Sequence, residues 1–185
     1  MTKATEAVLV AQINARVGPM DRYEIFEDPL TEALDEKGEV TGGGTMLGED
    51  GEVAYCDVEI CLPEVTEGLV ELLVSLLEEM GAPKGSKLLD GEQEVRQFGK
   101  NEGLAVYLNG FDLPAETYSS CDVNFVEEEF GRLVGEDGRV MGCWEGPRET
   151  AFYLYGPSFE TMRSKLVDFL ASYPLCERCR VVQIV

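Results

Sequence analysis

The sequence contains no histidine, and this absence removes the side chain that most often serves as a general base near neutral pH. Ser–His and Cys–His nucleophile pairs are excluded with it. Basic residues are also few, because 15 Lys and Arg stand against 36 Asp and Glu, a formal net charge of −21. Such a chain repels nucleic-acid backbones and anionic membranes and attracts cations or basic proteins. We therefore expect no binding to nucleic acid and no binding to membranes.

Long hydrophobic runs are missing as well. No apolar run reaches the roughly 18–20 residues that span a bilayer, and no segment has the length and cleavage site of a signal peptide. Hydrophobic residues make up 44% and charged residues 28% of the 185 residues, a composition typical of a globular protein. These observations predict a cytoplasmic protein.

The six cysteines are expected to be reduced in that compartment. Cys176 and Cys179 form a C-x-x-C pair, but a structural zinc site needs four ligands, so two distant cysteines would have to join them. The pair precedes a final strand rather than opening a helix, which argues against a thioredoxin-like motif. We expect no metal, no cofactor, and little loss of stability when both cysteines are changed to serine.

The two halves of the chain resemble each other. One alignment places Val40 on Val140, and a second places Leu73 on Leu166. The aligned segments are LTEALDEKGEVTGG (30–43) with FGRLVGEDGRVMGC (130–143), and LVELLVSLLEEMG (69–81) with MRSKLVDFLASYP (162–174). A duplication is the simplest explanation.

Each copy shows the pattern β-α-β-β-α-β. In the first copy, residues 7–17 predict a strand, and a short helix follows with Asp28 as its cap, Pro29 at its first position and Gly38 as its terminator. The fold class is therefore α+β, with tandem duplicated ferredoxin-like units. In each unit, helices cover one face of a four-stranded antiparallel sheet. The predicted divisions are a first unit at 1–90, a polar linker at 91–103 and a second unit at 104–185.

The glycine-rich stretch GEVTGGGTMLGEDGEV (38–53) is not a phosphate-binding loop. It follows a helix and leads into a hairpin, whereas a Walker-type loop needs a lysine and a following helix. Gly42, Gly43 and Gly44 therefore lie within a strand, where they indicate a bulge or the close approach of a backbone or ligand.

Two groups of residues on the strands are candidates for binding. The period of two in YCDVEICL places Tyr55, Asp57 and Glu59 on one face, which we expect to be the open face beside the glycine strand. They form a solvated surface or a site for a cation or basic side chains. In the second copy, the aromatic candidates for an open recognition surface, or for packing against the first sheet, are Trp144, Tyr153 and Tyr155.

The combination of GEVTGGGT, the acidic hairpin and GAPKGS resembles segments of an uncharacterised bacterial family with ferredoxin-like domains. The resemblance covers about half of residues 30–90. It implies the fold and carries no assigned activity.

Three functional hypotheses follow. The leading one is an acidic, non-catalytic cytosolic binding protein of the immunity or inhibitor type, which engages a basic protein partner as a monomer or homodimer. The alternative is an ACT-like tandem regulatory domain with a small-molecule ligand between its sheets. An enzyme that uses carboxylates or Cys176 ranks third, and no catalytic residue is assigned.

Overall fold

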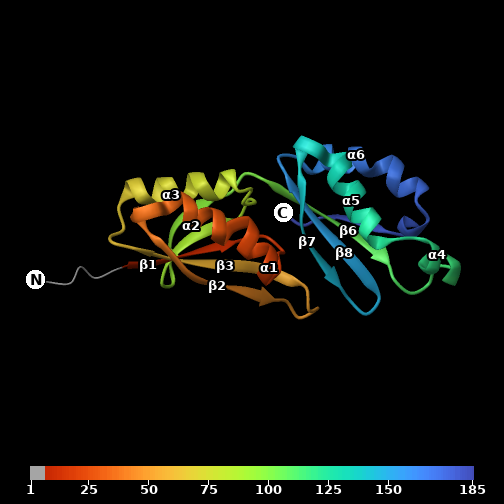
Figure 1. The fold of residues 1–185 in the computed structure, drawn as a ribbon, viewed down its shortest axis with the longest axis horizontal. Coiled ribbons are helices and arrows are strands. Elements are labelled where there is room, and N and C mark those ends of the chain that lie inside the picture. The colour runs from red at the N-terminus through yellow and green to blue at the C-terminus, as the bar shows by residue number, and fades with distance from the viewer. Residues whose placement is uncertain (1–6) are drawn as a thin grey trace, which may run out of the picture. The chain divides into compact units, whose positions relative to one another are not determined.

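The structure, a computed structural model, describes residues 7–185. The chain divides into two compact units between Lys100 and Asn101. Each unit is an antiparallel sheet with helices packed on it, so the α+β class with tandem ferredoxin-like units is confirmed (Figure 1). Residues 1–6 of the predicted first unit lie outside the described residues.

The first unit contains a five-stranded sheet in the order β2-β3-β1-β4-β5. Its elements are β1 (Ala7–Ile13), α1 (Pro19–Arg22), the π-helical turn η1 (Tyr23–Glu27), α2 (Asp28–Leu34), the 3-10 turn η2 (Asp35–Lys37), β2 (Glu39–Leu47), β3 (Val53–Leu62), α3 (Glu67–Glu79), β4 (Ser86–Asp90) and β5 (Gln93–Phe98).

Alternation along β3 builds the core of the first unit. Cys56, Val58, Ile60 and Leu62 are fully buried, because successive side chains of a strand point to opposite faces and this set faces the helices. Helix α3 begins at the Thr66 cap and buries three residues at helical spacing, Val70, Leu73 and Leu77.

The sequence prediction of a linker at residues 91–103 is corrected by strand β5, which pairs antiparallel with β4. The segment is polar because β5 is an edge strand, in which the backbone supplies the pairing and few side chains are buried. Phe98 is the residue of β5 that enters the core.

The first helix also begins earlier than the sequence predicted. Helical structure starts at Pro19 and continues through the π-helical turn into α2, so Asp28 and Pro29 lie inside it. A proline ring clashes with the carbonyl four residues earlier, here that of Ile25, and the wider π turn occurs at this position. The Gly18–Pro19 pair is the start signal that the prediction overlooked.

The second unit has a four-stranded sheet in the order β7-β8-β6-β9. Its elements are β6 (Glu102–Asn109), α4 (Ala115–Ser120), α5 (Val123–Val134), the 3-10 turn η3 (Gly135–Asp137), β7 (Arg139–Glu145), β8 (Glu149–Gly156), α6 (Phe159–Ser172), the 3-10 turn η4 (Pro174–Cys176) and β9 (Arg180–Gln183). Aromatic rings fill the core between sheet and helices, where Phe130 meets Phe152 and Phe169 edge to face.

Equivalent irregularities support the duplication. The pairing of β2 with β3 shifts register between Val40 and Gly42, and the pairing of β7 with β8 shifts between Val140 and Gly142. Leu73 and Leu166 are each fully buried on the second long helix of their unit. A bulge at the same place in both sheets is typical of two copies of one ancestral unit.

Within residues 7–185, no helix has the length and apolar character that crossing a membrane requires.

Candidate functional site

A cavity of about 400 Å³ lies at one end of the second unit, where β6 ends. Two of its lining residues, Leu108 and Thr150, are paired across β6 and β8. The full lining consists of Leu108, Asn109, Gly110, Tyr118, Cys121, Asp122, Val123, Thr150 and Leu175. This volume is within the range of small-molecule sites, and the lining mixes apolar and polar groups as such sites do.

Part of the cavity lining comes from a connection that is longer than its counterpart in the first unit. In the first unit, residues 14–22, including α1, lie between β1 and the helical residues 23–34 that align with α5, whereas in the second unit residues 110–122, including α4, connect β6 to α5. Tyr118, Cys121 and Asp122 of the cavity lining belong to this longer segment. Long connections within a compact unit are often functional.

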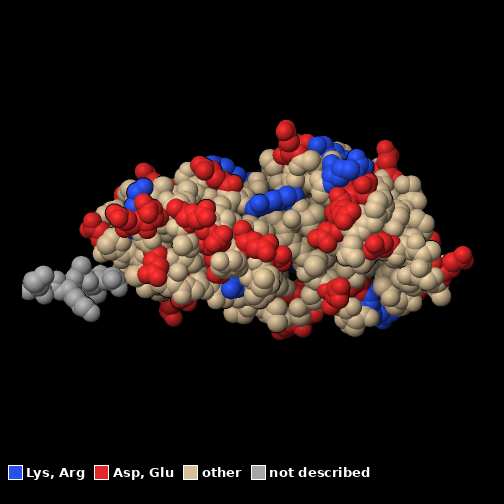
Figure 2. All heavy atoms as spheres, in the orientation of Figure 1, with Lys and Arg blue, Asp and Glu red and all other residues tan. Residues whose placement is uncertain are grey.

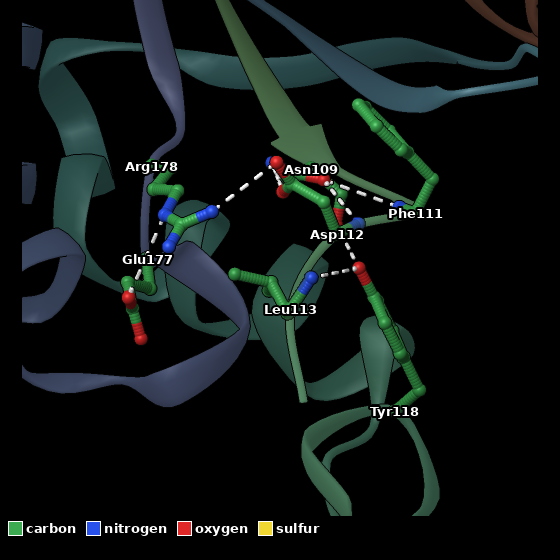
Figure 3. Close-up of polar contacts among 7 residues, drawn as sticks. All are labelled: Asn109, Phe111, Asp112, Leu113, Tyr118, Glu177 and Arg178. Carbon is green, nitrogen blue, oxygen red and sulfur yellow. Dashed lines mark hydrogen bonds and ion pairs between the residues drawn. The ribbon is translucent and has the colours of Figure 1, made fainter. Parts of the chain in front are cut away.

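A network of hydrogen bonds holds this segment in place (Figure 3). The Asn109 Oδ1 accepts from the backbone N–H of Phe111 at 3.1 Å and of Asp112 at 3.2 Å. The Tyr118 hydroxyl accepts from the Leu113 N–H at 3.0 Å and donates to the Asn109 carbonyl at 3.2 Å. Helix α4 is thereby fastened to the end of β6.

An ion pair ties the same segment to the C-terminal part of the unit. The Arg178 guanidinium lies 3.2 Å from the Asp112 carboxylate and 3.8 Å from that of Glu177 (Figure 3). Both partners of the Asp112 pair are exposed, so the pair contributes little stability and serves mainly to position the segment.

The start of α5 forms another wall. The Asp122 carboxylate caps this helix by accepting from the Asn124 N–H at 2.9 Å. The Tyr173 hydroxyl accepts from the Asp122 N–H at 3.1 Å, which joins the start of α5 to the end of α6. Asp122 therefore has a fixed backbone and an exposed carboxylate at the cavity.

Three thiols lie near the cavity. Burial raises the pKa of the Cys176 thiol to about 12, and the neighbouring Cys179 and Cys121 thiols act in the same direction. Burial also raises the pKa of the Cys179 thiol. A thiol with a pKa this high stays protonated near neutral pH and is a poor nucleophile, so the structure gives no support to Cys176 as a catalytic group.

Five of the six predicted residues of the first unit are brought together on one face of the sheet, and the exception is Gly43. Gly42 is paired with Glu59 and Gly44 with Asp57, and Tyr55 is paired with Met46. This is the face opposite to the buried side chains of β3, as the alternation predicted. The two carboxylate-bearing residues of this face differ in exposure: Glu59 is exposed and Asp57 is half-buried.

Asp57 has unusual electrostatics. Burial raises the pKa of its carboxyl above the usual value, and the Glu59 charge adds to this, while a hydrogen bond with the Gln12 side chain opposes it. Its Oδ1 atom is buried and has no hydrogen-bond partner among the described residues. This setting shifts the Asp57 carboxyl toward its protonated form relative to a solvent-exposed aspartate.

Gly43 differs from its two neighbours because it faces the helices. A Cβ at this position would lie 2.5 Å from the Asp57 carbonyl, 2.8 Å from the Glu27 carboxylate and 2.9 Å from the Arg22 guanidinium. Arg22 pairs with Glu27 and donates to the Thr45 hydroxyl at 2.7 Å. A glycine is needed at position 43 because the side chains of Arg22 and Glu27 approach the strand closely there. The π-helical turn brings these two residues, five apart in sequence, to the same face of the helical segment.

The aromatic candidates of the second unit do not form an exposed recognition surface. Tyr153 is 0% and Tyr155 1% exposed, and Trp144 is half-buried with its ring against Gly146. The reading of the two tyrosines as solvent-exposed is therefore wrong, although all three rings lie on the face opposite to the helices.

Metal coordination finds no support in the part of the chain that the structure describes. No group of three or more His, Cys, Asp or Glu side chains in it is arranged to hold a metal ion.

The sequence predictions missed the cavity residues, above all Asn109, Tyr118, Asp122 and Thr150. The available signal was the difference in length between the first connections of the two copies, which their alignment would have revealed. The Arg22–Glu27 pair was missed because its i,i+5 spacing fits neither an α-helix nor a strand.

No family model matches the chain, and no curated protein matches it. The resemblance to an uncharacterised bacterial family therefore stays a prediction.

Solved structures give matches over nearly the whole chain. A "putative monooxygenase" from Lactobacillus acidophilus NCFM is 12% identical with a TM-score of 0.31, over 98% of this chain and 95% of that one. A "putative monooxygenase" from Fusobacterium nucleatum is 9% identical with a TM-score of 0.33, over 98% and 92%. The first two RRM domains of the yeast poly(U) binding protein Pub1 are 16% identical with a TM-score of 0.25, over 96% and 99%.

These matches correct the leading functional hypothesis. Two of the three structures carry the name of an enzyme class, which contradicts the prediction of a non-catalytic immunity- or inhibitor-type protein and of its ACT-like alternative. Identities of 9–16% and TM-scores of 0.25–0.33 concern the fold alone. No activity passes from these proteins to this chain.

Proposed function

We propose that the second unit binds a small organic molecule, as substrate or other ligand, in the cavity at the end of β6. The observation that carries this proposal is the cavity of about 400 Å³, lined in part by the segment 110–122, whose counterpart in the first unit, residues 14–22, is shorter. The segment is held by its own hydrogen bonds, so the site is formed before a ligand arrives.

The lining defines the chemistry of the ligand. Leu108, Val123 and Leu175 offer apolar contact, and the Thr150 hydroxyl offers a hydrogen bond. Asp122 is the one charged side chain among the nine described lining residues. The ligand is therefore neutral or cationic, with an apolar part, because an anion would meet an uncompensated carboxylate.

Ligand-observed NMR with a panel of uncharged and cationic metabolites tests this proposal. Val123→Phe fills the cavity and should abolish binding. Asp122→Asn keeps the helix cap and removes the charge, so it should weaken cationic ligands at least about tenfold and uncharged ones little. Asp168→Asn on the exposed surface of α6 is the matched control and should bind as the parent does.

Two results would contradict the proposal. One is that no compound of the panel binds at millimolar concentration. The other is that binding survives Val123→Phe unchanged in a protein whose circular dichroism matches the parent.

We also propose a cytoplasmic location. The free thiols of Cys56, Cys121, Cys176 and Cys179 support it, because thiols persist in a reducing compartment.

A further inference from the structure

The edge strand β2 of the first sheet differs from the edge strands β5, β7 and β9. The strand order places β2 and β5 at the edges of the first sheet and β7 and β9 at those of the second. Edge strands expose backbone N–H and C=O groups that pair with another chain unless charges, prolines or shortness prevent it. On β5, the edge carries Glu94 and Arg96, and β9 is four residues long with Arg180.

Strand β2 has few of these protections. It is nine residues long, and from Val40 to Leu47 it contains no charged residue and no proline. Strand β7 is also uncharged in its middle, but its Met141 and Gly142 are buried, whereas Thr41 and Gly43 on β2 are exposed. Figure 1 shows β2 along one margin of the first sheet.

Exposed apolar side chains flank the same edge. Met46 and Leu47 at the end of β2 are 49% and 60% exposed. The Arg22–Thr45 hydrogen bond brings the first helical segment to this place, where Met20 is 71% and Tyr23 50% exposed. An open strand edge bordered by apolar side chains is the pattern of a β-augmentation surface.

The sequence of the edge reads the same in both directions about Gly43, as Thr41-Gly-Gly-Gly-Thr45. A two-fold axis at Gly43 would pair Gly42 of one copy with Gly44 of the other and Thr41 with Thr45. Such an isologous pairing is self-complementary and brings no like charges opposite each other. The bulge at Thr41 lies at the end of this stretch, and pairing from Gly42 to Met46 is regular.

We propose that β2 is a self-association edge, through which two copies of this chain pair antiparallel about Gly43. The occupant is a second copy rather than a basic partner, because residues Val40 to Leu47 carry no charge and the adjacent Glu27 is already paired with Arg22. The site is separate from the cavity of the second unit, so this inference goes beyond the proposed function.

Charge sets the conditions for this association. Each copy carries a formal net charge of −21, and acidic side chains are spread over the face drawn in Figure 2. Repulsion between two such chains weakens as salt screens it, over a Debye length of about 8 Å at physiological ionic strength. Dimerisation should therefore strengthen as salt rises, whereas association with a basic partner would weaken.

Sedimentation equilibrium of the full chain, up to about 1 mM and at low and high salt, tests the proposal. Gly44→Lys should weaken the dimer at least about tenfold, because the two lysines face each other diagonally across the axis. A Cβ at Gly44 meets no atom within 4 Å, so the fold accepts the change. Gln93→Lys adds the same charge at the β5 edge and should leave the dimer unchanged.

A protein that stays monomeric at every concentration and salt overturns the proposal. So does a dimer that Gly44→Lys and Thr41→Lys both leave intact, or one that Gln93→Lys weakens equally. Circular dichroism of each variant excludes misfolding as the cause, and Thr41→Lys replaces Gly44→Lys if that variant does not fold.

Discussion

At the scale of single residues, Asp35 and Gly135 occupy equivalent positions with nearly the same backbone. Each follows the last α-helical residue of its segment, with φ and ψ of 49° and −126° at Asp35 and 54° and −126° at Gly135. Side chains disfavour positive φ because the Cβ crowds the backbone. The first copy therefore stores strain where the second uses glycine.

Changing Asp35→Gly should stabilise the protein by about 0.5–1 kcal/mol. Relief of strain of about 1–3 kcal/mol exceeds the extra entropy that glycine gives the unfolded chain. Urea denaturation measures the difference, and Gly135→Ala is the reverse control, which should destabilise by a similar amount. A lower stability for Asp35→Gly would contradict this prediction. It would show that the Asp35 side chain stabilises the folded state by more than the strain of its backbone destabilises it.

Asp57 gives a prediction that depends on pH. Because burial raises the pKa of its carboxyl, the folded state favours the protonated form. That stabilisation is fully present below the unfolded pKa, about 3.9, and is lost as pH rises through the folded value. Asp57→Asn should therefore be more stable than the parent at pH 7, by less than about 1 kcal/mol because the group is only half-buried.

The measurement is the difference in free energy of unfolding between Asp57→Asn and the parent from pH 7 down to pH 3.5. The difference should shrink as pH falls. Glu59→Gln, on the exposed neighbouring residue of the same face, should show a smaller effect. A gain for Asp57→Asn that is constant with pH would contradict the assigned cause.

At the scale of elements, β2 and the helical segment above it constrain each other. The π-helical turn places Arg22 and Glu27 together, and both reach the strand where Gly43 has no side chain. Three consecutive glycines thus have different roles, because Gly43 makes room for this pair and Gly44 faces open space.

Gly43→Ala should destabilise the protein by about 2 kcal/mol, since the new Cβ would lie 2.5 Å from the Asp57 carbonyl and the strands must move apart. Gly44→Ala is the matched control and should change stability by about 0.5 kcal/mol or less, in the stabilising direction. Denaturant midpoints at constant slope provide the comparison. Equal effects at the two positions would contradict the separate roles.

At the scale of the whole molecule, the two units share one architecture and differ from each other in different elements. The second unit has the longer segment 110–122 and the cavity beside it, while the first has the additional strand β5 and an uncharged edge at β2. A duplicated chain can change one copy while the other keeps the shared architecture. The proposed ligand site and the proposed self-association edge therefore belong to different units.

Much of the fold was predictable from the sequence. Period-two alternation in β3 predicted which side chains are buried, and the alignment of Val40 with Val140 predicted the duplication that the equivalent register shifts support. Strand β5 was not predictable in this way, because an edge strand buries little and its polar sequence resembles a linker. The sequence also predicted that Tyr55, Asp57 and Glu59 share the face of the sheet opposite to the helices, while a binding role for this face stays a prediction.

The sequence by itself determined the fold class, the duplication and the buried face of β3, because these depend on local periodicity and on comparison within the chain. Only the tertiary structure decided that Gly43 accommodates an ion pair, that Tyr153 and Tyr155 are buried, and that a cavity lies beside Thr150. These features arise from side chains that are distant in sequence and meet only when helices pack on sheets, so no local pattern records them.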